Sequence, residues 1–139
     1  MKHTLPNKQK EKLIVKISSF LGRQQEEILI AYLFGSFVKS ESFSDIDVAL
    51  VMRSEPDQPL SLELALENQL EKIVKFPVDV RILNKAPLAF SQNVFRTGRV
   101  ILDRDPNFRA DFQGKILKQY FDFAPFRRRY LQEVTNAPI

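Results

Sequence analysis

The sequence contains no cysteine and only one histidine. Without cysteine the chain forms no disulfide, no thiolate zinc site and no cysteine nucleophile, so a reducing cytoplasm is the expected compartment. The one histidine, His3, lies in an amino-terminal segment that we expect to be frayed, which rules out a histidine-based triad or zinc site. Any catalysis by this chain must therefore use carboxylates.

Long apolar runs are missing as well. No stretch approaches the roughly 20 consecutive apolar residues that span a bilayer, and no apolar run follows the charged start of the chain, as a signal peptide requires. We expect one soluble domain, because 139 residues with 44% hydrophobic content can bury a substantial core. The net charge of +4 suits phosphate-bearing or acidic partners, but it serves solubility equally well.

Hydrophobic periodicity divides the chain into alternating helices and strands. Strands are predicted over residues 28–34, 45–52, 78–83 and 99–103, and helices over residues 8–21, 61–75 and 87–98. The link between the first two strands is too short for a parallel crossover, so these strands should be antiparallel neighbours. The pattern predicts a single α/β domain with a mixed sheet of about four strands flanked by helices.

An aromatic-rich helical tail is predicted over residues 108–134, and we expect Pro125 to break it in two. The chain is therefore interpreted as an α/β core over residues 1–106. Residues 107–139 form a tail of the same domain, packed on the core or on a partner.

The most informative motif lies where the first two strands meet. Gly35 and Ser36 directly follow one buried strand, and Asp45 and Asp47 open the next. In antiparallel neighbours these ends share one edge of the sheet, and strand alternation puts both aspartates on one face. Two carboxylates so placed suit Mg²⁺, which prefers oxygen ligands and retains substrate phosphates in its shell. The glycine lets the backbone approach a phosphate, and the serine adds a hydroxyl to an anion-binding turn.

A third carboxylate, Asp79, lies within a later apolar strand. Taken alone it is an edge-strand residue that faces water and pairs with Arg81. Beside Asp45 and Asp47 the catalytic interpretation is stronger, because a two-metal phosphoryl-transfer site requires a further acid. We expect the three carboxylates to converge, each mostly desolvated. Their repulsion should then keep a proton on at least one of them at higher pH than on a free aspartate.

These motifs together resemble the DNA polymerase β-like nucleotidyltransferase superfamily. The resemblance rests on the runs 34–36 (FGS), 44–48 (SDIDV) and 78–80 (VDV). The length and the run 78–87 (VDVRILNKAP) are similar to the minimal (MNT) nucleotidyltransferases, and in particular to MntA-type antitoxins encoded beside HEPN-domain toxins. The tail 120–131 (YFDFAPFRRRYL) also resembles theirs. A Gly-Ser pair combined with Asp-x-Asp in strand context is a specific signal, whereas each half alone is weak.

The resemblance implies a fold like the polymerase β palm and a role for each motif residue. Gly35 and Ser36 would hold the β- and γ-phosphates of a nucleoside triphosphate. Asp45 and Asp47 would ligate Mg²⁺, and Asp79 would help bind a second metal and activate the acceptor hydroxyl. The reaction would be an in-line attack on the α-phosphorus with loss of pyrophosphate, promoted by positioning and charge.

The connector between the two motifs departs from the family. Ser36 and Asp45 are nine positions apart, a shorter spacing than in many relatives, and Ser40 stands where those relatives carry a glycine. Lys39 in this connector can reach a phosphate, although an exposed solubilising lysine is the commoner case.

Three functions are therefore compared. The resemblance implies first a cytoplasmic antitoxin enzyme that transfers AMP from ATP to a tyrosine of a cognate HEPN toxin and forms a hetero-oligomer with it. The alternative is a catalytically weak module that neutralises such a toxin by binding alone, which the short connector favours. A transferase for small molecules needs a second substrate domain, for which the tail leaves too little room. A membrane or nucleic-acid partner is not expected.

Overall fold

The computed structural model describes residues 1–24 and 26–136; residue 25 and residues 137–139, the last part of the predicted tail, lie outside the described residues. In chain order the elements are β1 (His3–Thr4), α1 (Asn7–Gln24), β2 (Ile28–Phe34), α2 (Ser36–Lys39), β3 (Ser42–Phe43), β4 (Ile46–Met52), α3 (Pro59–Val74), β5 (Val78–Ile82), α4 (Leu88–Thr97), β6 (Arg99–Asp103) and α5 (Pro106–Asn136). The predicted α/β class is confirmed. None of the described helices is long and apolar enough to cross a membrane.

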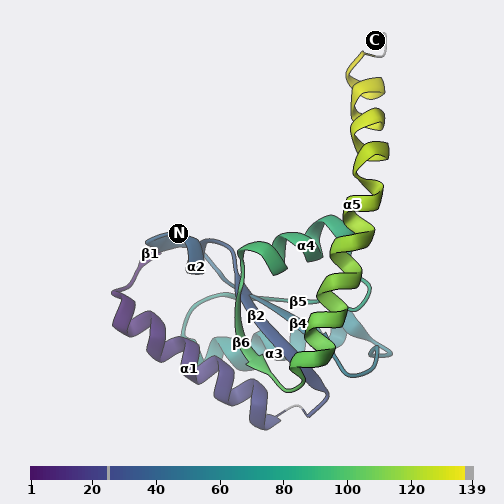
Figure 1. Ribbon diagram of the computed structural model, residues 1–139. Coiled ribbons are helices and arrows are strands. Elements are labelled where there is room, and N and C mark those ends of the chain that lie inside the picture. Colours follow the sequence, from purple (N-terminus) through teal and green to yellow (C-terminus); the bar gives the residue numbers. More distant parts are fainter. Residues whose placement is uncertain (25, 137–139) are drawn as a thin grey trace.

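A four-stranded mixed sheet of order β5-β4-β2-β6 forms the centre of the molecule (Figure 1). Strand β2 pairs antiparallel with β4, which confirms the predicted pairing of these two strands, and it also pairs antiparallel with β6. Strand β4 pairs parallel with β5, because α3 supplies the crossover that a parallel pair needs. The register puts Phe34 beside Asp47 and Asp47 beside Asp79, so the candidate residues meet at one edge of the sheet.

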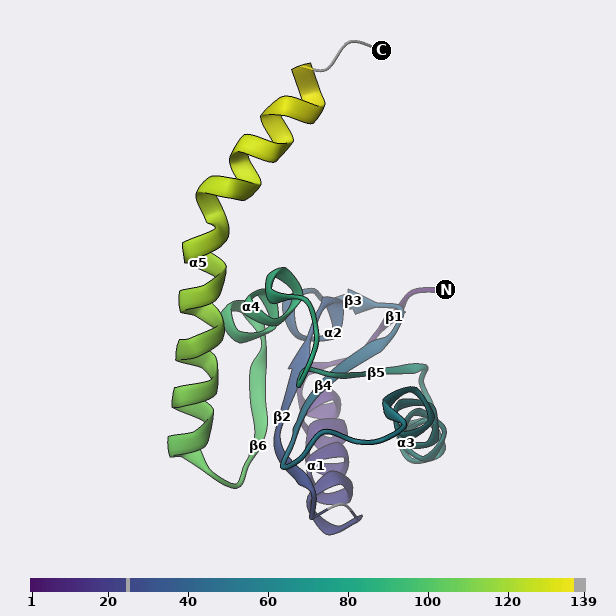
Figure 2. The same cartoon turned by 90° about the vertical axis from the view of Figure 1, so that its right-hand side faces the viewer.

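Helices cover both faces of this sheet, with α5 on one side and α3 on the other (Figure 2). On one face α1 and α3 contribute Ile17, Leu21, Leu66 and Leu70 to a buried cluster with β2, β4 and β5. On the other face α4 and the start of α5 cover a second cluster, which includes Tyr32, Ala49, Val51 and Val94. Burial on two faces explains why β2 and β4 read as continuous apolar runs rather than as alternating ones.

The amino terminus is ordered by a small second sheet in which β1 pairs with β3. His3 lies opposite Phe43, and its ring centroid lies 4.9 Å from that of Phe76. The expectation of a frayed terminus is therefore wrong. Two-residue strands leave no hydrophobic periodicity in the sequence, and the order comes from aromatic packing that only the folded chain provides.

The helix α5 continues through Pro125, so the predicted break at this residue is wrong. An internal proline removes one backbone hydrogen bond and crowds the preceding turn, which bends a helix more readily than it ends one. Figure 2 shows α5 changing direction along its length.

The first turns of α5 are fixed to the core. Arg109 Nε lies 2.6 Å from Asp103 Oδ2, and the Tyr32 hydroxyl donates a hydrogen bond to the side chain of Gln113. Beyond these contacts the helix projects away from the sheet (Figure 1). Every side chain that the structure describes between residues 121 and 130 is exposed.

Candidate active site

Gly35 forms the turn between β2 and α2, and its backbone explains why this position carries glycine. Its φ of 78° lies in the region that L side chains rarely adopt. A Cβ atom placed on Gly35 would also overlap Oδ2 of Asp47. The glycine therefore leaves room for the Asp47 carboxylate. From the sequence, the need for a glycine at this position had been explained by the approach of a bound phosphate. Ser36 follows as the half-buried first residue of α2.

Asp47 lies on the central strand β4, where the candidate residues meet, and its side chain is half-buried. The pKa of its carboxyl is raised from 3.8 to about 6, chiefly by burial and then by the nearby charges of Asp79 and Asp45, against the opposing effect of Arg81. This agrees with the prediction that at least one carboxylate of the cluster would hold its proton at raised pH. The structure therefore brings Gly35, Asp47 and Asp79 together, with Asp45 close enough to act on Asp47 electrostatically.

Asp79 has features of both interpretations that the sequence left open, the solvent-facing partner of Arg81 and the third carboxylate of the site. It lies in register with Asp47, as the catalytic interpretation requires, and Oδ1 of its carboxylate lies 3.4 Å from Nε of Arg81. The Asp79 and Arg81 side chains are 39% and 59% exposed, so this is a solvated ion pair that another cation can replace.

Asp45 differs from the other two aspartates. It precedes β4, which begins at Ile46, and its side chain is exposed. The predictions that Asp45 begins the strand and that all three carboxylates are desolvated are wrong. The physical reason is that backbone pairing begins one residue later, where the Ile46 N–H donates to the carbonyl of Pro77 at 2.9 Å.

Within the described residues, no three or more His, Cys, Asp or Glu side chains are grouped so that they could hold a metal ion. The donor chemistry nevertheless fits Mg²⁺ bound with substrate, because this ion commonly takes one or two carboxylates and completes its shell with phosphates and water. Asp47 and Asp79 supply such a pair on adjacent strands, and the repulsion between them is what a cation would relieve.

Three glutamates on α3 hold the free edge of β5. Their carboxylates accept backbone hydrogen bonds from alternate strand residues: Glu71 from Val78 at 3.0 Å, Glu67 from Val80 at 2.8 Å and Glu63 from Ile82 at 2.9 Å. The match is geometric, since four helical residues rise about 6 Å and two strand residues span about 6.6 Å. The carboxylates take the place of a neighbouring strand, so this edge is closed to further pairing.

This ladder of glutamates also fixes Asp79, which lies between two clamped N–H groups. Burial raises the pKa of Glu67, the Val80 N–H lowers it, and the neighbouring Asp79 carboxyl raises it again. Sequence reasoning missed these residues. Their spacing of four was visible as a polar stripe beside the leucine stripe of the helix, but it gave no indication of its target.

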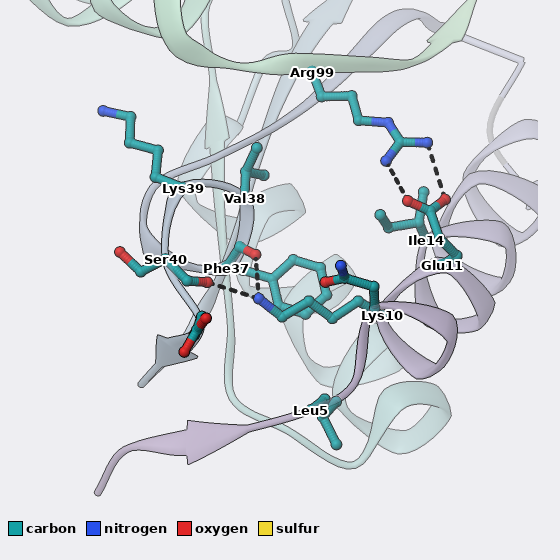
Figure 3. Close-up of a pocket in the computed structure, with 11 residues that line it drawn as sticks. Leu5, Lys10, Glu11, Ile14, Phe37, Val38, Lys39, Ser40 and Arg99 are labelled. Carbon is teal, nitrogen blue, oxygen red and sulfur yellow. Dashed lines mark hydrogen bonds and ion pairs between the residues drawn. The ribbon is translucent and has the colours of Figure 1, made fainter.

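Lys10 of α1 is a second residue that sequence reasoning missed. It is 9% exposed, and its Nζ donates to the carbonyls of Phe37 at 3.0 Å and Ser40 at 2.8 Å (Figure 3). These bonds hold the end of α2 against the core. No sequence signal distinguishes Lys10 from the exposed lysines of the same helix.

Lys39 stands apart from the aspartates. It is exposed at the end of α2 and lines a hollow of about 270 Å³ between α1 and α2, which none of the three aspartates lines. Figure 3 shows its side chain directed away from Lys10, and Arg99 pairs with Glu11 across the same hollow at 2.7 Å. Among the predicted site residues, Lys39 therefore shares only the short helix α2 with Ser36, and it does not line a hollow with the aspartates.

The fold is that of the nucleotidyltransferases. The family model described as polymerase beta, nucleotidyltransferase matches residues 15–107, a span that includes the glycine turn and all three aspartates. The chain belongs to this family. No curated protein matches the chain by sequence.

Solved structures share its fold at low sequence identity. The chain resembles one in the complex of tri-AMPylated Shewanella oneidensis HEPN toxin with MNT antitoxin, at 22% identity and a TM-score of 0.76, over 91% of this chain and 98% of that one. It also resembles a chain of a toxin–antitoxin structure with AMP-PNP, at 23% identity and a TM-score of 0.75, over 90% and 98%. At this identity the likeness establishes the fold alone.

Proposed function

We propose that this chain is a Mg²⁺-dependent nucleotidyltransferase that transfers AMP from ATP to a tyrosine hydroxyl of a HEPN toxin, and that it acts as a cytoplasmic antitoxin. The observation that supports the proposal most strongly is the placement of Asp47 and Asp79 side by side on adjacent strands, with Gly35 shaped around the Asp47 carboxylate. The acceptor and the nucleotide are suggested by the structural neighbours, one an AMPylated HEPN toxin complex and one a complex with AMP-PNP.

The chemistry proposed for the chain's own residues is simple. Gly35 and Ser36 hold the β- and γ-phosphates, and Asp47 and Asp79 hold Mg²⁺ with help from Asp45. Mg²⁺, when bound by these carboxylates, would supply positive charge that offsets the negative charge of the phosphates. The acceptor oxygen forms a bond to the α-phosphorus while the bond from that phosphorus to the bridging oxygen breaks and pyrophosphate leaves. The hydroxyl proton passes to the Asp79 carboxylate.

The experiment that tests this proposal compares two positions of the label in ATP. Purified chain is incubated with Mg²⁺ and a HEPN-domain toxin, using ATP labelled at the α- or at the γ-phosphate. We expect label from the α-position on the partner and label from the γ-position in pyrophosphate. Label on the partner from the γ-position would instead indicate a kinase. A partner that carries no label from either position would overturn the proposed transfer reaction.

A second candidate function is neutralisation by binding alone. It is favoured by the exposed outer part of α5, where the exposed fractions of Phe121 and Tyr130 are 63% and 65%. Large exposed aromatic side chains of this kind are typical of protein–protein interfaces. The two candidates differ in one respect that can be measured, since only an enzyme silences more partner molecules than it can bind.

A further inference from the structure

The proposed phosphate turn and Asp79 lie on opposite sides of Asp47. Gly35 and Ser36 follow β2, Asp47 lies on the central strand β4, and Asp79 lies on the edge strand β5. In-line displacement requires the attacking oxygen to approach the phosphorus from the side opposite to the leaving pyrophosphate. If pyrophosphate leaves toward the glycine turn, the acceptor must approach from the β5 side.

The candidate residues of β5 share a face with the helix α4. Strand alternation puts Asp79 and Arg81 on one face of β5. On β4 it puts Asp47 on the face that carries Ala49 and Val51, which pack in the cluster under α4 and α5. An acceptor that approaches from the β5 side on this face therefore meets the loop between β5 and α4 and the first turn of α4.

A hollow of about 320 Å³ lies in this place. It is lined by Glu63, Arg81, Ile82, Ala86, Pro87 and Phe90. Arg81 both lines the hollow and approaches Asp79, with Nε 3.4 Å from Oδ1, so the hollow adjoins the side chain that pairs with the proposed base.

The walls of the hollow suit an aromatic ring. Ala86, Pro87 and Phe90 supply apolar surface, and the Phe90 ring is held edge-on against Phe34 at a centroid distance of 5.5 Å. Aromatic side chains favour such edge-to-face and offset contacts. The volume lies at the lower end of the roughly 300–1,000 Å³ that is usual for ligand pockets, which is enough for one side chain but too little for a nucleotide and its acceptor together.

The closed edge of β5 argues against an acceptor that binds as an added strand of the sheet. The N–H groups of Val78, Val80 and Ile82 already donate to glutamates of α3. An extended partner segment that added to the sheet at this edge would have to displace those carboxylates. The acceptor is therefore expected to reach the site as a single inserted side chain.

We propose that the hollow between β5 and α4 is the acceptor subsite, in which Phe90 and Pro87 hold the ring of the tyrosine whose hydroxyl is adenylylated. This rests on the proposed function and adds to it the place of the acceptor. A neighbouring hollow of about 250 Å³ shares Glu63, Ile82 and Ala86 with the first, and it receives the residues that flank the tyrosine in the partner.

The test measures acceptor and nucleotide separately. Phe90→Ala enlarges the hollow and Ala86→Leu fills it, so both variants should disturb a bound ring although they act on packing in opposite ways. We expect kcat/KM for the HEPN partner to fall at least tenfold in each variant, while the affinity for a nonhydrolysable ATP analogue changes less than twofold. Phe108→Ala, which alters a partly exposed aromatic of α5 that does not line the hollow, is the matched control and should retain wild-type kcat/KM.

The outcomes separate the subsite from the overall function. Wild-type kcat/KM in both folded variants would overturn the subsite while AMP transfer stands. Weaker binding of the ATP analogue would assign the hollow to the nucleotide base instead, and an unchanged kcat with a raised KM and a weaker partner complex would assign it to docking. Both results would also overturn the subsite. If wild-type chain transfers no AMP at all, the proposed function itself fails, which the wild-type reaction reveals before any variant is measured.

A peptide analogue sharpens the test. A partner-derived peptide with phenylalanine in place of the acceptor tyrosine retains the ring but not the hydroxyl. It should inhibit wild-type transfer competitively against the partner and inhibit Phe90→Ala at least tenfold less. Equal inhibition of both proteins would overturn the subsite.

Discussion

The sheet edge that carries the aspartates and the outer part of α5 are organised in opposite ways. At the sheet edge three candidate residues are held by neighbours: Gly35 leaves room for the Asp47 carboxylate, and Asp79 lies between N–H groups that donate to Glu67 and Glu71. The outer part of α5 carries only exposed side chains among those described between residues 121 and 130. Preorganised groups suit chemistry, because their geometry must not relax during the reaction. An exposed aromatic helix suits recognition.

This difference suggests that catalysis and partner binding can be altered independently. An isolated helical segment is marginally stable in water, so the projecting part of α5 gains most from contact with another surface. The exposed Phe121 and Tyr130 are the groups that would be buried by such contact. The following predictions test this separation, beginning with the largest expected effect.

Asp47→Asn should abolish AMP transfer while leaving the complex with the partner intact. The substitution removes a charge at the centre of the site, and a loss of about 4 kcal/mol of transition-state stabilisation corresponds to about a 10³-fold slower reaction. The rate is measured with labelled ATP, and the complex by co-purification. Asp57→Asn, at an exposed position in the loop before α3, is the matched control. A rate within tenfold of wild type in Asp47→Asn would remove this residue from the site.

Tyr130→Ala combined with Phe121→Ala should weaken the partner complex about tenfold or more, since truncation of buried interface aromatics costs upward of about 1 kcal/mol each. Binding of the ATP analogue should be unchanged, because these residues project away from the sheet. Calorimetric titration with the partner measures the first quantity, and titration with the analogue measures the second. Loss of nucleotide affinity in this variant would mean that the two regions are coupled.

Glu67→Ala should lower the free energy of unfolding by about 1–2 kcal/mol, because the Val80 N–H loses its acceptor in a half-buried place. It should also reduce kcat, since the strand that carries Asp79 loses one of its anchors. Glu67→Gln keeps an oxygen acceptor and should recover most of both quantities. Equal defects in the alanine and glutamine variants would show that the charge of Glu67, and not its hydrogen bond, matters.

The smallest predicted effect concerns the stability of the metal-free chain. The pKa of Asp47 is raised in the folded state from 3.8 to about 6, so the folded state binds the proton more tightly than the unfolded state. The stability that protonation confers is complete below pH 3.8 and is lost as the pH rises through 6. At pH 7.5 Asp47→Asn should therefore be more stable than wild type, by about 1 kcal/mol once solvent screening of a half-exposed group is allowed for.

Denaturation of both proteins in chelator at pH 7.5 and at pH 5 measures this difference, which should shrink at the lower pH. Mg²⁺ with the ATP analogue should stabilise wild type and have little effect on the variant, because stabilisation follows affinity for the folded state. A wild type as stable as the variant at pH 7.5, with no response to Mg²⁺ and analogue, would mean that Asp47 is under no electrostatic strain.

The sequence was sufficient to predict the mixed sheet and the meeting of Gly35 and Asp47 within it, while the catalytic roles of these residues stay predictions. A continuous apolar run identified β2 at its observed bounds, and the strand predicted over residues 99–103 matches β6. The short link after β2 required the antiparallel pair that brings Asp47 to the glycine turn. The parallel pairing that adds Asp79 follows from the helix between β4 and β5. These features depend on local pattern and on chain connectivity, both of which a single sequence carries.

The supports of the site could not be predicted. Lys10 reaches carbonyls 27 and 30 residues away, and the glutamates of α3 reach N–H groups 7 to 19 residues away. Such contacts depend on how helices pack on the sheet, and charged residues on helices usually face water. The exposure of Asp45 and the continuity of α5 through Pro125 also depend on backbone hydrogen bonds that residue type alone does not specify.

Turnover on the partner tests the central claim most directly. The HEPN toxin is incubated with ATP, Mg²⁺ and a tenfold smaller amount of the chain, and the intact mass of the toxin is followed together with its activity. We predict that nearly all of the toxin gains the mass of AMP and loses activity, because one catalyst modifies many acceptors. Toxin that keeps its mass, and is silenced only when the chain is present in equal amount, would contradict the account and leave binding alone.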